Sequence, residues 1–251
     1  MSQRLTLSSA PFAGRTGRGV RIAVVDSGIA AGHPHVGGVA GGVSLLENGE
    51  DPADYRDRLG HGTAVAGAIR EKASDAELLA VRIFDRELKA TGEVLARAIH
   101  WAADHGAQLI NLSLGTPNEG RRELLTESLQ YATARGAIVI AAAEHDGAPM
   151  YPGALDGAIG VLLDSSCARE ELVVHDGAAG LRRVAASGYP RPIPGVPAER
   201  NFSGLSFAVA NATGFLARAI EGGGDLHVLL ATQTKVHPDA TDGADSRTLG
   251  A

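Results

Sequence analysis

The chain has a single cysteine and few aromatic residues. Cys167 stands alone among 251 residues, so no disulfide can form within the chain. Phenylalanine, tyrosine and tryptophan together make up 4% of the residues, so small aliphatic side chains must supply most of the core. No apolar run approaches the roughly 20 residues that a membrane-spanning helix needs.

Several classes of binding site are also missing. There is no glycine-rich phosphate loop with its lysine, and no His-x-x-x-His or cysteine pair with metal-ligand spacing. The formal charge is −6 and no stripe of Lys and Arg appears. We therefore expect no nucleic-acid partner, no membrane partner and no cofactor, with a structural calcium left open. The start of the chain does not resemble a secretory signal, so we expect a cytoplasmic location. The sequence makes no prediction of the oligomeric state.

What the chain does have is glycine, at 33 residues, and a regular alternation of two patterns. Short apolar runs typical of buried strands alternate with stretches of helical apolar spacing. Such alternation predicts an α/β fold with three layers, in which a mainly parallel sheet is flanked by helices on both faces. The runs predict strands over 21–25, 77–84, 107–114, 136–143, 158–163 and 172–175, and helices over 63–71, 92–105, 122–135 and 206–221.

Three side chains in these segments could form a nucleophilic catalytic group. Asp26 follows a predicted strand, His61 lies between two glycines at the start of a predicted helix, and Ser206 opens another helix. A serine hydroxyl needs a base within hydrogen-bond reach, and that base needs a third group to orient it. We therefore assign Ser206 as the nucleophile, His61 as the general base and acid, and Asp26 as the orienting carboxylate. The backbone N–H of Ser206 is a candidate for holding an oxyanion.

Four stretches of the sequence resemble the motifs of the subtilisin-like serine peptidases, the subtilase family. They are Asp26-Ser27-Gly28-Ile29 with His33-Pro34, Asp57 through Gly67, Asn111-Leu112-Ser113-Leu114-Gly115, and Ser203-Gly204-Leu205-Ser206. The resemblance implies a serine endopeptidase that cleaves peptide bonds through an acyl-enzyme. It also implies that Ser113, Leu114 and Gly115 bind the peptide substrate as an added strand. We divide the chain into an N-terminal arm (1–19), a subtilisin-like catalytic domain (20–231) and a polar C-terminal tail (232–251).

One of the departures from the family pattern concerns the oxyanion. The resemblance implies an asparagine that donates to the oxyanion after the strand over 136–143, and the best match to that position is Glu144. An ionised carboxylate would repel the oxyanion, and losing one such donor costs ~3–4 kcal/mol. Three outcomes stay open: a protonated Glu144 donates, a neighbour such as His145 donates, or catalysis is weak.

These features favour a dedicated intracellular processing protease, for instance one that removes a leader from a ribosomally made peptide. Two other classes of function compete with this hypothesis. Glu144 suits a weak or inactive pseudopeptidase that binds peptides or scaffolds a partner. A ligase or cyclase would keep the catalytic group and pass the acyl group to an amine instead of water.

Overall fold

The computed structural model describes residues 2–46, 51–175, 182–224, 226 and 230. Nine strands form one sheet in the order β1-β10-β11-β9-β6-β5-β2-β4-β3. Only β1 with β10 and β10 with β11 pair antiparallel, which confirms the mainly parallel sheet. The strands are β1 (Ser2–Thr6), β2 (Arg21–Asp26), β3 (Gly41–Ser44), β4 (Glu77–Arg82), β5 (Leu109–Leu112), β6 (Ile138–Ala142), β9 (Ala158–Leu163), β10 (Glu171–His175) and β11 (Arg182–Ala186).

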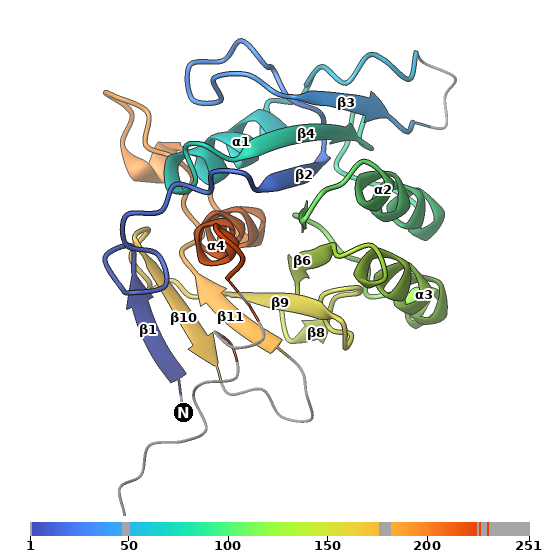
Figure 1. Cartoon of the computed structure of the whole chain (residues 1–251). Helices are drawn as coiled ribbons and strands as arrows, with labels where there is room; N and C mark the ends of the chain where they lie inside the picture. The colour runs from blue at the N-terminus through green and yellow to red at the C-terminus, as the bar shows by residue number, and fades with distance from the viewer. Residues whose placement is uncertain (1, 47–50, 176–181, 225, 227–229, 231–251) are drawn as a thin grey trace, which may run out of the picture.

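Helices cover both faces of the sheet (Figure 1). One face carries α1 (His61–Lys72) and α4 (Leu205–Ile220), and the other carries α2 (Gly92–Asp104) and α3 (Arg122–Thr133). Local sequence accounts for the start of α2, because the Thr91 side chain caps it by accepting from the Val94 N–H at 3.3 Å. The predicted three-layer α/β fold is confirmed.

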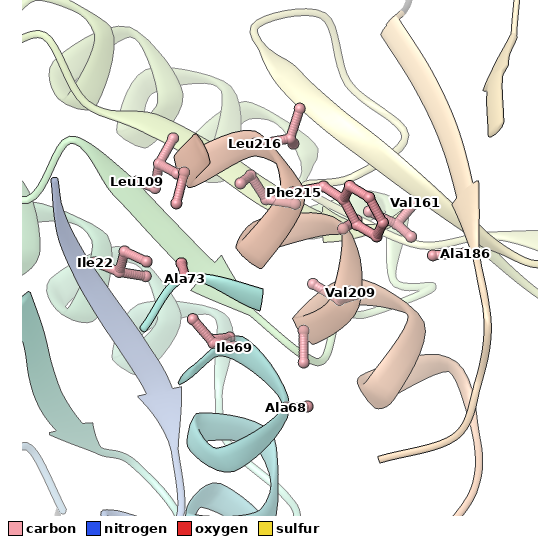
Figure 2. Close-up of a cluster of buried hydrophobic side chains, with 14 of the residues drawn as sticks. Ile22, Ala68, Ile69, Ala73, Leu109, Val161, Ala186, Val209, Phe215 and Leu216 are labelled. Atoms are coloured by element: carbon pink, nitrogen blue, oxygen red, sulfur yellow. The ribbon is translucent and has the colours of Figure 1, made fainter. Parts of the chain in front are cut away.

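A cluster of apolar side chains fills the space between the sheet and the α1–α4 layer. Figure 2 shows Ile69 of α1 together with Val209 and Phe215 of α4, near Ile22 of β2 and Leu109 of β5. A second cluster lies between the sheet and the α2–α3 layer. Many members of both clusters are alanines, as expected from the shortage of aromatic residues. None of the described helices combines the length and the apolar character that crossing a bilayer requires.

The segment over 1–19, which we assigned to an N-terminal arm, is packed onto the rest of the fold. Its strand β1 pairs with β10 at the edge of the sheet. Phe12 is fully buried, and its ring lies edge-on to that of Phe215 at a centroid distance of 5.2 Å. The packing of this segment could not be predicted from its polar sequence, because an edge strand needs few apolar residues. Leu5 is the one buried residue of β1. The predicted tail over 232–251 lies outside the described residues.

The sequence analysis also missed four short strands. β3 contains two glycines, β11 begins with two arginines, and β7 (Glu144–His145) and β8 (Ala148–Pro149) form a separate two-stranded hairpin. Short strands with such residues lack the apolar runs that predict buried strands. β7 and β8 follow the carboxyl end of β6, the edge of the sheet where the site described next lies.

Candidate active site

Asp26 and His61 are in direct contact. Asp26 is the last residue of β2 and is fully buried, and His61 is the first residue of α1. The Nδ1 atom of His61 lies 2.7 Å from Oδ1 of Asp26, and the same oxygen accepts from the backbone N–H of Ser27 at 2.8 Å. Because a carboxylate only accepts, the proton on the ring sits on Nδ1. The Nε2 atom is then left as a base.

The surroundings of His61 raise its pKa above the ordinary value of a histidine. Burial of the ring by itself lowers the pKa, because it disfavours the charged form. The hydrogen bond to Asp26 and the negative charges of Asp26 and Asp57 act in the opposite direction and outweigh it. The imidazolium that would form during proton transfer is therefore stabilised by its neighbours.

Asp57 fixes the turn that presents His61. One of its oxygens accepts from the Ser27 hydroxyl at 2.8 Å, the Leu59 N–H at 2.9 Å and the Gly60 N–H at 2.8 Å. The other accepts from the N–H of Thr63 at 2.8 Å and from its hydroxyl at 2.6 Å. Sequence analysis gave Asp57 no role beyond membership of a motif. Its spacing, four residues before the histidine at a helix start, was the signal that it organises the turn.

Ser206 lies at the start of α4. Gly204, with φ of 144°, precedes the helix, and Ser206 is its second residue. The Ser206 hydroxyl donates to the main-chain oxygen of Ser113 at 3.4 Å. The ring of Phe207, the next residue, lies 5.6 Å from the His61 ring between centroids. The Ser206 hydroxyl is thus bonded to Ser113, and the next residue of the same helix packs near the His61 ring.

A buried set of hydrogen bonds ties the Ser113 segment to α4. The Asn111 side-chain amide donates to the Ser113 hydroxyl at 2.9 Å, and the Thr213 hydroxyl donates to the Asn111 side-chain oxygen at 2.9 Å. All three residues are buried. Since Thr213 and Ser206 belong to the same helix, these bonds fix that helix against β5, which carries Asn111, and against Ser113 just beyond it. Sequence analysis did not find this connection, because it joins residues 102 positions apart.

Ser113, Leu114 and Gly115 continue the chain beyond β5, as their assigned role requires. Ser113 is buried, whereas Leu114 and Gly115 are half-buried. A side chain at Gly115 would come within 2.8 Å of the main-chain oxygen of Tyr151, because Thr116 and Tyr151 form an isolated bridge there. This close approach explains why position 115 holds a glycine.

Glu144 lies on an exposed hairpin next to this region. It pairs with Pro149 across the hairpin, and the turn contains Asp146 and Gly147, both with positive φ. Both Glu144 and its neighbour His145 are exposed. The charge of Glu144 acts on Arg183: burial lowers the pKa of Arg183, and Glu144 opposes that shift. The position that the sequence analysis matched to the asparagine of the family is therefore occupied by the carboxylate of Glu144, and the guanidinium of Arg183 lies close enough to feel its charge.

Comparisons with known proteins bear on the family of this chain. The model of the subtilase family matches residues 17–165. Thermitase from Thermoactinomyces vulgaris is 38% identical over 160 residues, which are 58% of this chain and 55% of thermitase. Subtilisin BL from Lederbergia lenta is 31% identical over 231 residues, which are 87% of this chain and 80% of that protein. This chain therefore spans just over half the length of thermitase but four-fifths of subtilisin BL.

The fold is similar to that of a solved structure described as a cold adapted subtilisin-like serine proteinase. The TM-score is 0.65 at 22% sequence identity, with 88% of this chain and 82% of the other chain covered. At that level of identity the likeness shows the fold alone.

Proposed function

The chain belongs to the subtilase family of serine proteases, and we propose that it cleaves peptide bonds through an acyl-enzyme formed on Ser206. The observation that carries this proposal is the 2.7 Å contact between Asp26 and His61. It is supported by Phe207, the residue after Ser206, whose ring lies 5.6 Å from the His61 ring between centroids. The substrate is a peptide or protein.

The proposed reaction follows from these positions. The Ser206 hydroxyl turns from the Ser113 oxygen to Nε2 of His61 and attacks the carbonyl carbon, while His61 takes its proton. Asp26 stabilises the resulting imidazolium. His61 then gives the proton to the leaving amine as the carbon–nitrogen bond breaks, and water releases the acyl group by the same steps in reverse. The Ser206 N–H lies in the first turn of α4, where backbone donors lack helical partners, and this supports its proposed role in holding the oxyanion.

Covalent labelling of Ser206 tests the proposal. A fluorophosphonate probe is expected to label the wild-type chain once, and Ser206→Ala is expected to abolish the label because the nucleophile is gone. The matched control is Ser128→Ala, which removes a buried hydroxyl from α3 on the opposite face of the sheet and is expected to label normally. Intact mass is the measurement.

The other outcomes of this experiment identify the competing functions. Absence of labelling in the wild type would favour a pseudopeptidase. A labelled protein whose peptide products lack the mass of one added water would be a ligase or cyclase.

We also propose that Glu144 alters the oxyanion site and shifts the pH optimum. Support comes from its place two residues after the end of β6, at the start of the β7–β8 hairpin. In Glu144→Gln a neutral amide replaces the carboxylate, so kcat at neutral pH is expected to rise, by up to about 100-fold if the amide donates to the oxyanion. The measurement is kcat/KM from acid to alkaline pH.

The rise of kcat/KM with pH on the acid side of that profile should be the same in the wild type and in Glu144→Gln. His61 works as a base only when neutral, so activity rises with pH through its pKa, which is raised above the ordinary value. His145→Gln serves as the matched variant, since a fall there would identify His145 as the donor. A profile that Glu144→Gln leaves unchanged from acid to alkaline pH would contradict the role of Glu144.

The role in the cell that we propose is dedicated processing, for instance leader removal from a ribosomally made peptide in the cytoplasm. The altered oxyanion position supports it, because it suits slow and selective cleavage better than bulk digestion. The cytoplasmic location rests on the sequence alone, and fractionation of cells that express the chain tests it. Rapid digestion of an unfolded generic protein would argue against a dedicated role.

A further inference from the structure

A fully buried arginine lies at the end of the strand next to Asp26. Arg82 is the last residue of β4 and pairs in register with Asp26, the last residue of β2. The two strands lie side by side (Figure 1). Because partners in neighbouring parallel strands point to the same face of a sheet, the Arg82 side chain lies on the α1 side, as that of Asp26 does. Its exposed fraction is 0%.

Arg82 joins two segments that lie outside the sheet. One nitrogen of its guanidinium donates to the main-chain oxygen of Asp54 at 3.2 Å, and another donates to the Asp85 carboxylate at 3.0 Å. Taking a charge out of water is costly, and apolar side chains of similar volume are often at least as stable in such a place. Packing alone therefore does not explain an arginine at this position, whereas the two segments that it joins do.

The first of these segments carries Asp57, whose side chain fixes the turn before α1. Asp54 lies three residues before Asp57 in the chain. Between the two, the main-chain oxygen of Tyr55 accepts from the Ile29 N–H at 3.0 Å. The segment is thus held at one point by the loop after β2 and at another by the guanidinium of Arg82.

Asp57 connects this segment to both members of the catalytic pair. The Ser27 hydroxyl donates to Asp57 at 2.8 Å and accepts from the Gly62 N–H at 2.9 Å. Ser27 directly follows Asp26, and Gly62 directly follows His61. A displacement of Asp57 would therefore change the 2.7 Å contact between His61 and Asp26.

The second partner of Arg82 does not depend on it for a counter-charge. Asp85 is 30% exposed, and its carboxylate lies 3.9 Å from a guanidinium nitrogen of Arg58 and 3.8 Å from one of Arg86. An apolar residue in place of Arg82 would therefore leave no buried carboxylate without a cation. The stability of the fold should then depend little on Arg82.

We propose that Arg82 is a positioning residue for His61: from the neighbouring strand it holds the segment that carries Asp57, and thereby the contact between His61 and Asp26. The proposal rests on the proposed peptidase function. It implies that loss of the guanidinium damages catalysis more than it damages the fold.

Arg82→Met tests this inference, because methionine fills much of the same space but cannot donate. We expect kcat to fall about 30-fold, somewhat less than the ~100-fold cost of a 1 Å displacement in an active site. KM should stay within about threefold of the wild type, because a fully buried side chain does not touch the substrate. The thermal unfolding midpoint should move by less than about 3 °C.

Proton NMR gives a second measurement that needs no substrate. The low-field resonance of the His61 Nδ1 proton reports the 2.7 Å hydrogen bond to Asp26. In Arg82→Met this resonance should move upfield and broaden, because a looser bond lets the proton exchange faster with water.

Arg70→Met is the matched control, since it removes another arginine that holds loops together. Arg70 lies nine residues after His61 on α1. Its guanidinium donates to four main-chain oxygens, those of Val36, Gly38, Ser74 and Ala76. Arg70→Met is expected to lower the unfolding midpoint and to leave kcat and the His61 resonance as in the wild type.

Arg82→Lys is the conservative variant. It keeps a charged donor but not the forked geometry with which a guanidinium reaches two acceptors. Both its kcat and its His61 resonance are therefore expected to lie between those of the wild type and those of Arg82→Met.

Each outcome supports or overturns the inference. Arg82→Met with a kcat within threefold of the wild type, or with a lower kcat and an unchanged His61 resonance, would overturn it. If Arg82→Met does not fold, Arg82→Lys decides, and wild-type kcat and resonance in that variant would overturn the role. If the wild type neither cleaves peptides nor labels at Ser206 while the resonance responds as expected, the peptidase function has failed and the positioning role stands.

Discussion

Asp26→Asn is expected to lower kcat by about ten-thousand-fold while the fold is kept. An asparagine has nearly the same shape as the aspartate, so it fills the buried space at the end of β2. Its amide, however, can present an N–H to His61 and favour the wrong tautomer of the ring. It also carries no charge to stabilise the imidazolium, which Asp26 does from 2.7 Å.

The measurement is kcat for a cleavable peptide, with the thermal unfolding midpoint recorded beside it. Asp104→Asn is the matched control, because Asp104 is an aspartate on α2 that pairs with Arg135 far from the site. It should leave kcat unchanged. If Asp26→Asn kept more than a tenth of the wild-type kcat, Asp26 would not be the group that orients His61.

Gly62→Ala is expected to damage both stability and activity. A Cβ at this position would collide with the main-chain oxygen of Gly28 and would lie 3.1 Å from Cβ of Asp26. The start of α1 would have to move away from β2. Overpacking of this kind costs ~1–3 kcal/mol, and a shift of about 1 Å between His61 and Asp26 would lower kcat roughly 100-fold.

Urea unfolding and kcat together check this prediction. The matched control is Gly67→Ala in the same helix, where the nearest atom to an added Cβ is the Cβ of His35 at 3.2 Å, on a loop that can shift slightly. Alanine also favours the helix more than glycine does. Gly67→Ala should therefore change stability little. Equal effects at the two positions would show that close approach at Gly62 is not what positions His61.

Much of the fold could be predicted from the sequence, because buried strands and amphipathic helices each have a local pattern of apolar residues. The apolar run that ends at Asp26 and the helical spacing over 92–105 correspond to β2 and α2 with small shifts at the ends. β11 was missed because it begins with Arg182 and Arg183, which interrupt the apolar run that would predict a strand. It is nevertheless a strand, because it pairs with β9. Pairing between strands depends on partners that a local pattern does not contain.

The candidate site, like the fold, could be predicted only in part from the sequence. Asp26, His61 and Ser206 could be proposed from the sequence because each lies in a short motif with recognisable neighbours. The role of Asp57 in the turn before α1 was not predicted, since its five hydrogen bonds form only when that turn is folded.

The sequence by itself determined the α/β layering and the family resemblance and supplied the candidates for the reactive side chains, because periodicity and short motifs are properties of neighbouring residues. Only the tertiary structure decided how they meet. It joined Thr213 to Asn111 behind the Ser113 segment, joined Arg82 to the main chain at Asp54, and set Glu144 on a hairpin near Arg183. The physical reason is that hydrogen bonds, steric fit and charge act over a few ångströms in space, whatever the separation along the chain.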